Sequence, residues 1–230
     1  MGPSKQSGRF LKKKVRELLK SADFDLSLEA LYGWPARQVV NPLFSFLYST
    51  DEQIRWRAVL AMGAVVSRHA HEDMESARVI MRRLMWNLND ESGGIGWGSP
   101  EAMGEILARH EGLAEKYSRI LLSYAKEDGN FQEHEWMQRG VLWAIGRLSQ
   151  ARPHFTKDAV PWIISYLKSP DACARGLAAW IMGLLEVKEA RQSLEHLKDD
   201  EGEVKLFLEP RLVKRTVKEL AREALERLSL

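Results

Sequence analysis

The segments IRWRAVLAMG, residues 54–63, and IGWGSPEAMG, residues 95–104, carry the pattern that decides the fold. Ile, Trp, Ala, Met and Gly coincide between them without a gap. Shorter versions follow as WAIG at 143–146 and WIMG at 180–183. The last glycine of each segment, at positions 63, 104, 146 and 183, recurs after 41, 42 and 37 residues. A period of about 40 residues is typical of proteins built from stacked structural repeats.

Apolar residues recur at helical spacing almost throughout the chain, and strand signals are nearly absent. The sequence predicts helix pairs whose first helices lie near 36–48, 74–89, 113–126 and 157–168. Their second helices are expected near 52–69, 99–109, 134–149 and 171–186, with a closing pair near 188–198 and 212–228. A glycine inside a helix costs about 1 kcal/mol relative to alanine. Four glycines at matched positions of the second helices therefore predict close helix contacts that a Cβ would obstruct.

Residues 1–35 are expected to form an N-terminal helical cap, continuous as one domain with a repeat array at 36–230. In the cap, Phe10–Lys20 places an apolar stripe on one side and lysines and arginines on the other. The basic side has two interpretations. The favoured one is a solvated surface at the end of the array, and the other is an arm for nucleic acid or an acidic partner.

Composition excludes several classes of protein. The 230 residues carry a net charge of only +2, so the chain as a whole has no strong attraction for nucleic acid or an anionic membrane. The single cysteine, Cys173, excludes an internal disulfide and a cysteine-based zinc site. No apolar run approaches the ~20 residues of a membrane-spanning helix, and the N-terminus lacks an apolar signal core. From these features we expect a soluble cytoplasmic protein. We expect no metal or cofactor, because no second histidine cluster accompanies Glu133-His134-Glu135.

The segment from Asp171 to Gly183 follows the pattern Asp-x-x-x-Arg-Gly-Leu-Ala-Ala-x-x-x-Gly. With helix pairs of about 40 residues it resembles HEAT repeats, and the phycobilisome-lyase subclass is the most similar in pattern. The resemblance covers roughly 36–230 and implies an all-α, right-handed α–α superhelix, a HEAT/armadillo-like solenoid of about five helix pairs. Residues 82–105 are also similar to uncharacterised bacterial HEAT-like proteins. Since HEAT proteins include lyase subunits, regulatory scaffolds and DNA glycosylases, the resemblance points to a fold and leaves the function open.

The second repeat is broken where the first repeat has the start of a helix. Residues 92–98, SGGIGWG, carry four glycines, which do not favour a helix. Ser99-Pro100-Glu101 then resembles a helix start, with Ser as N-cap and Pro at the first position. We expect a glycine-rich loop at 90–98 over the start of a helix at 99–109.

By analogy with other solenoids, the second helices line the concave surface, so this loop and Trp97 are expected beside a groove. On the preceding helix, Arg83, Asn87 and Asp90 lie at i, i+4 and i+7 with Trp86 beside them, and they form a polar stripe. The candidate binding residues are Arg55, Trp56, Arg57, Arg83, Trp86, Asn87, Asp90, Glu91, Gly94, Gly96, Trp97, Glu101, Glu105 and Arg139. Two structural alternatives stay open: Asp90, Glu91 and Ser92 only brace the loop, and the repeated tryptophans belong to the core between repeats.

Three functions fit these features. The favoured one is a scaffold that binds a peptide or partner protein in the groove, where Trp and Arg suit interface anchors. A nucleic-acid-binding or DNA-repair-like protein is disfavoured by the low net charge and by Glu101 and Glu105. A lyase- or chaperone-like protein for a bound small molecule is the third. Catalysis is uncertain and the less favoured outcome, because no Ser-His-Asp, Walker or dinucleotide motif occurs.

Overall fold

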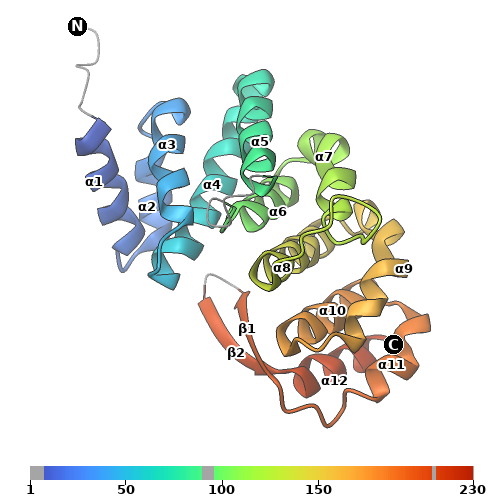
Figure 1. Ribbon diagram of the computed structural model, residues 1–230. Coiled ribbons are helices and arrows are strands. Elements are labelled where there is room, and N and C mark those ends of the chain that lie inside the picture. Colours follow the sequence, from blue (N-terminus) through green and yellow to red (C-terminus); the bar gives the residue numbers. More distant parts are fainter. Residues whose placement is uncertain (1–7, 90–95, 209–210, 230) are drawn as a thin grey trace, which may run out of the picture. The chain divides into compact units, whose positions relative to one another are not determined.

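The computed structural model describes residues 8–89, 96–208 and 211–229 (Figure 1). The chain forms two compact units, residues 1–102 and 103–230, and each is described by itself. The expectation of one continuous domain stays a prediction.

Unit 1 contains five complete helices and the first turn of a sixth. These are α1 (Gly8–Lys20), α2 (Phe24–Leu31), α3 (Ala36–Leu47), α4 (Glu52–Glu72), α5 (Met74–Leu88) and the start of α6 (Ser99–Arg109). Asp23, Asp51 and Asp73 begin α2, α4 and α5, and each carboxylate accepts a backbone N–H of the first turn. Helix α3 packs along α4, α4 packs against α5, and α1 contacts α2, α3 and α4. The helices expected in this unit are therefore confirmed.

Unit 2 continues the pattern with shorter first helices and ends in a hairpin and a helix. Its elements after α6 are α7 (Glu111–Ser123), α8 (Glu135–Ala151), η1 (Pro153–Phe155), η2 (Lys157–Ala159), α9 (Val160–Ile163), η3 (Ile164–Lys168), α10 (Ala172–Leu184), η4 (Lys188–Ala190), α11 (Arg191–Glu195), β1 (Glu203–Leu208), β2 (Arg211–Thr216) and α12 (Val217–Arg227). Helix α10 lies at its centre and packs against α8, α12, η3 and β1 (Figure 1).

The repeat glycines of unit 2 mark close contacts between successive second helices. A Cβ on Gly104 of α6 would lie 2.5 Å from the Cα of Ala144 on α8. A Cβ on Gly146 of α8 would lie 2.1 Å from the ring of Trp180 on α10, and one on Gly183 of α10 would lie 2.8 Å from the Cα of Ala224 on α12. These distances confirm the predicted packing role for three glycines. The fourth, Gly63, is buried within α4.

The end of the chain differs from the expected helix pair at 188–198 and 212–228. Residues 203–208 and 211–216 form an antiparallel hairpin, in which Leu206 pairs with Val213. Helix α12 begins only after Thr216, whose hydroxyl and backbone N–H form a reciprocal capping box with Glu219. The hairpin is held by tertiary contacts, since Val204 and Leu206 are fully buried and Trp143 Nε1 donates to the carbonyl oxygen of Phe207 at 3.0 Å.

The helix expected at 157–168 is likewise broken into η2, α9 and η3. Pro161 stands in the first turn of α9. Its ring would clash with the carbonyl of residue 157 in a continuous helix, and it has no N–H to donate. The chain therefore uses short turns here, and the expected helix at 188–198 shrinks to η4 and the five residues of α11.

Candidate functional site

The turn at residues 96–98 leads directly into α6 and sets the position of Trp97. Gly98 has a φ of +72°, which favours glycine. A Cβ there would lie 2.9 Å from the carbonyl oxygen of Leu47. The N–H of Ala102 donates to the carbonyl oxygen of Gly98 at 3.0 Å, so the helix starts where the sequence predicted. The side chain of Ser99 is not its cap, because its hydroxyl is buried without a hydrogen-bond partner.

The four repeat tryptophans have different surroundings. Trp56, Trp143 and Trp180 are buried, which supports the core interpretation for these three. Trp97 is 37% exposed, and Trp86 on α5 is 73% exposed. A large aromatic ring that reaches the surface can anchor a partner.

Glu101 lies two residues after the start of α6, and its Oε2 atom is buried without a hydrogen-bond partner. Burial raises the pKa of this carboxyl, although its own backbone N–H and the charge of Arg55 oppose the shift. The Arg55 side chain is mostly buried, 18% exposed, and its guanidinium lies 3.9 Å from Glu52. The Oε2 atom of Glu101 is thus a hydrogen-bond acceptor shielded from solvent. Such an atom costs free energy unless a donor binds to it.

Glu105 stands one turn later on α6, but its carboxylate is fully paired within the fold. It is fully buried, and its carboxylate receives Arg109 Nε at 2.5 Å and Arg147 Nε at 2.7 Å. Arg147 belongs to α8, so this carboxylate ties α6 to α8 within unit 2. The sequence places the two glutamates on one helix face, yet among the described residues only Glu101 has a carboxylate oxygen, Oε2, that is buried without a hydrogen-bond partner.

Two of the candidate arginines also have structural partners. Arg57 donates to the carbonyl oxygens of Leu19 at 2.9 Å and Ser21 at 2.6 Å, at the end of α1. Arg139 forms a two-point ion pair with Asp171, at 2.8 and 2.9 Å.

The polar stripe on α5 contacts α3. Arg83 donates to Asn41 at 2.6 Å. Asn87 is buried and donates to the hydroxyl of Tyr48 at 2.8 Å. Burial raises the pKa of Tyr48, against the charge of Arg83 and the Asn87 bond. These side chains link α3 to α5, and Trp86 beside them is 73% exposed.

Asp90, Glu91 and Gly94 lie outside the described residues, as do residues 90–95 of the loop expected at 90–98. Gly96 is buried in the turn. Three described candidates belong to the start of α6 or face it, and with the neighbouring Ser99 we name them the α6-start cluster: Arg55, Trp97, Ser99 and Glu101.

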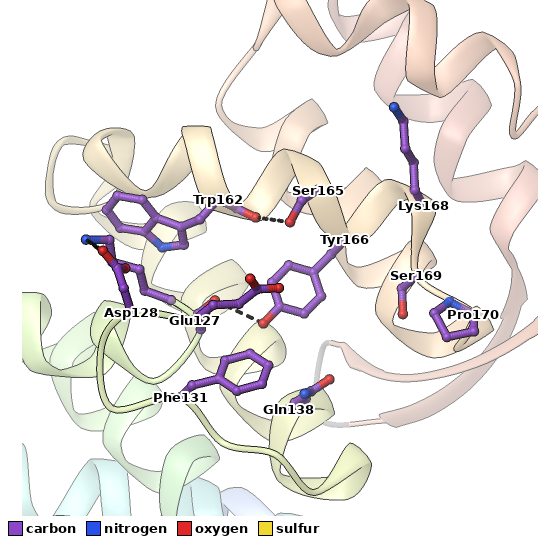
Figure 2. Close-up of a pocket in the computed structure, with 12 residues that line it drawn as sticks. Glu127, Asp128, Phe131, Gln138, Trp162, Ser165, Tyr166, Lys168, Ser169 and Pro170 are labelled. Atoms are coloured by element: carbon purple, nitrogen blue, oxygen red, sulfur yellow. Dashed lines mark hydrogen bonds and ion pairs between the residues drawn. The ribbon is translucent and has the colours of Figure 1, made fainter.

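Unit 2 has a pocket of about 560 Å³ that the sequence analysis missed (Figure 2). The segment 125–131 after α7 and the η3 region supply most of its walls. Figure 2 shows the rings of Trp162, Tyr166 and Phe131 around the carboxylate of Glu127. No cation of the described residues pairs with Glu127, whereas Lys126 pairs with Asp128 at 3.0 Å.

The donors of this pocket are only partly used. Trp162 Nε1 is buried without an acceptor, and Tyr166 donates to the carbonyl oxygen of Ala125 at 3.0 Å. Burial and the charge of Glu127 raise the pKa of Tyr166 to about 12. The one feature of the sequence that could have indicated this pocket is Trp162, which falls outside the repeated tryptophan positions. That segments 125–131 and 162–170 lie next to each other is visible only in the tertiary structure. Within the described ranges, no group of three His, Cys, Asp or Glu could hold a metal ion.

Comparisons with known proteins support the fold. No family model matches the chain. An uncharacterised protein of Archaeoglobus fulgidus is 31% identical over 125 residues, 53% of this chain, and the match spans 57% of that relative. A designed armadillo repeat protein is 17% identical, with a TM-score of 0.52 over 95% of this chain and 99% of its own. A designed armadillo repeat protein solved with a (KR)4 peptide is also 17% identical, with a TM-score of 0.53 and the same coverage.

Another neighbour, computationally designed for modular peptide recognition, is 16% identical and has a TM-score of 0.51 over 94% of this chain and 99% of its own. At these identities the likeness concerns the fold alone. In the described ranges, no helix is long and apolar enough to cross a membrane. The chain is thus a mostly helical repeat protein with an armadillo/HEAT-like fold, to which a C-terminal β-hairpin is added.

Proposed function

We propose that this protein is a repeat scaffold that binds a peptide or an extended segment of a partner protein, and that the α6-start cluster contributes to the binding surface. The observation that carries the proposal is the orphaned oxygen of Glu101, buried beside Arg55 and close in sequence to the half-exposed ring of Trp97. Buried polar atoms without partners are rare in folded proteins and often belong to functional sites.

The chemistry of the cluster limits what would bind there. Trp97 offers an apolar surface, and Trp and Arg are enriched among residues that dominate binding energy. Glu101 offers an acceptor, which a backbone N–H or a cationic side chain of the partner would satisfy. A donor favours the ionised carboxylate. Affinity should therefore rise as the pH rises through the pKa of Glu101 in the free protein.

The fold neighbours are consistent with this proposal, since one was solved with a (KR)4 peptide and another was designed for modular peptide recognition. Neither identifies the partner of this chain. The pocket in unit 2, with its mixed aromatic and polar lining, is a second place where a peptide side chain would fit. Variants of Trp97 or Glu101 and a variant of Trp162 distinguish binding at the α6-start cluster from binding at this pocket.

The test is a selection from a random-peptide display library on the immobilised protein, followed by isothermal titration of the selected peptide. We expect Trp97→Ala and Glu101→Gln each to weaken binding at least tenfold while the circular dichroism spectrum stays unchanged. Glu115→Gln is the matched control, because this exposed carboxylate on α7 has no partner in the described structure. It should leave the affinity within twofold.

The outcomes separate location from function. If Trp162→Phe abolishes binding and both α6-start variants bind normally, the pocket in unit 2 is the docking place and the α6-start proposal is wrong. If no peptide is enriched, the scaffold function itself is refuted. The resemblance of the sequence pattern to phycobilisome-lyase HEAT repeats suggests instead a lyase- or chaperone-like role. A chromophore that co-purifies with the native protein would favour that role.

A further inference from the structure

We propose that the outer face of α1 is a docking surface for the phosphate backbone of a single-stranded nucleic acid. Helix α1 carries six cationic side chains and one carboxylate, Glu17, which is a net charge of +5 over 13 residues. The whole chain has a net charge of only +2, so the positive charge is concentrated on this helix.

The free cations form a row. Arg9, Lys13, Arg16 and Lys20 follow one another at intervals of four, three and four residues, which places them on one stripe of an α-helix. All four are exposed, and none has an ion pair or hydrogen bond in the described structure. With a rise of about 1.5 Å per residue, the row extends for roughly 16 Å.

Several surface cations outside this row are held in ion pairs. Arg37 pairs with Asp73, Arg82 with Glu75 and Arg152 with Glu111. On α1, the only carboxylate is bound to Lys14. Helix α1 also has no acidic residue in its first turn, where cations such as Arg9 are disfavoured by the helix dipole. An arrangement that destabilises the free helix is relieved when an anion binds.

The row is also held rigidly. Leu11, Val15 and Leu19 are buried on the opposite side of α1, which packs against α2, α3 and α4 (Figure 1). Arg57 of α4 binds the carbonyl oxygens at the end of the helix. A fixed row binds a polyanion without first ordering the helix, which lowers the entropic cost of association.

Two observations favour nucleic acid over other anionic partners. Phe10 flanks the row and is 51% exposed, and an exposed aromatic ring can stack on an unpaired base. The apolar side of α1 is used for packing inside unit 1, so the helix has no face left to insert into a membrane. A single strand offers both repeated phosphates and free bases, whereas an acidic protein offers no bases.

The test measures the anisotropy of a fluorescein-labelled dT12 oligonucleotide between 50 and 200 mM salt. Four phosphate contacts on a single strand predict a slope of log K against log salt of about −2.8, a loss of about 50-fold over this range. The α1 variant replaces Arg9, Lys13, Arg16 and Lys20 by Gln. It should retain its helical content, because glutamine is a good helix former, and should lose at least tenfold in affinity and most of the slope.

A matched variant replaces four cations of unit 2 by Gln: Lys116, Arg119, Lys157 and Lys188. They are equally exposed and unpaired in the described structure, so the net charge changes by the same amount. It should bind dT12 within threefold of wild type. Phe10→Ala should weaken binding about fivefold or more without changing the slope, and Glu17→Gln should strengthen it.

Three results would overturn the proposal. Equal losses in the two four-site variants would reduce the effect to net charge. Binding of a 12-residue polyglutamate as tight as that of dT12 would identify an acidic protein as the better partner. Binding of phosphatidylserine vesicles that survives in Phe10→Ala, with no binding of dT12, would point to a membrane surface. None of these results bears on the peptide proposal, whose cluster lies on other residues.

Discussion

Glu101 and Glu105 stand one helical turn apart, and the structure predicts opposite effects for the same substitution at the two positions. Glu105→Gln exchanges a fully buried carboxylate for an amide of the same shape. The carboxylate now receives two guanidinium N–H donors, at 2.5 and 2.7 Å. Hydrogen bonds to charged groups contribute about 1.5–3 kcal/mol each.

The amide of glutamine keeps one oxygen acceptor and turns an NH2 group towards the other guanidinium, so one charged bond is lost. We expect Glu105→Gln to lower the free energy of unfolding by about 2–3 kcal/mol. For a chain of this size, about 2–4 °C in melting temperature corresponds to 1 kcal/mol. The melting temperature should thus fall by roughly 4–12 °C at pH 7.

Glu101→Gln should raise the melting temperature at pH 7 to 8. Burial raises the pKa of Glu101 above its ordinary value of 4.5, with Arg55 opposing the shift. A carboxyl whose pKa is raised on folding stabilises the fold below its unfolded pKa and loses this contribution as the pH rises through the folded pKa. Glutamine mimics the neutral form at every pH. The gain should therefore be present at pH 8 and vanish near pH 4.

The assay is thermal unfolding followed by circular dichroism at 222 nm from pH 4 to pH 8, with Glu115→Gln as the control for loss of one surface charge. The reasoning is refuted if the two variants shift the melting temperature in the same direction at pH 8. It is also refuted if the Glu101→Gln difference does not depend on pH.

Three further substitutions test the packing. Gly104→Ala places a Cβ 2.5 Å from the Cα of Ala144, and we expect a loss of about 1–3 kcal/mol in urea unfolding despite the better helix propensity of alanine; an unchanged stability would contradict the close contact. Gly98→Ala puts a side chain at a φ of +72°, which should cost about 1–2 kcal/mol and lower the melting temperature. Trp143→Phe removes the donor to Phe207 and should weaken the free energy of unfolding by about 1–3 kcal/mol. Hydrogen exchange should then accelerate in 203–208, and retained protection there would show that the bond does not hold the hairpin.

Much of the fold follows from local rules that the sequence displays. Helices α1, α3, α4 and α5 and the start of α6 at Ser99 lie where periodicity, caps and glycines placed them, whereas α2 was not predicted as a separate helix. Neighbouring helices approach closely at Gly104, Gly146 and Gly183, because stacked repeats place successive second helices at similar distances. These features depend on residues within one or two turns, or on a period, and both are readable in one dimension.

The hairpin and the binding surfaces depend on contacts between distant residues. Residues 211–216 have a pattern that also suits a helix, and the strand is selected because β1 finds buried positions on α10 and the indole of Trp143. The pocket arises because 125–131 lies against 162–170, which no local pattern specifies.

On one face of α6, some features of the candidate site follow from the sequence and others only from the tertiary structure. The sequence by itself determined that α6 starts late and that Glu101 and Glu105 lie on the same side, since both follow from local turn chemistry and the helical period. Only the tertiary structure decided that Arg147 of α8 pairs with Glu105 while the Oε2 atom of Glu101 has no hydrogen-bond partner among the described residues. The physical reason is that the free energy of a buried charge depends on the groups that surround it in space, and these come from other helices.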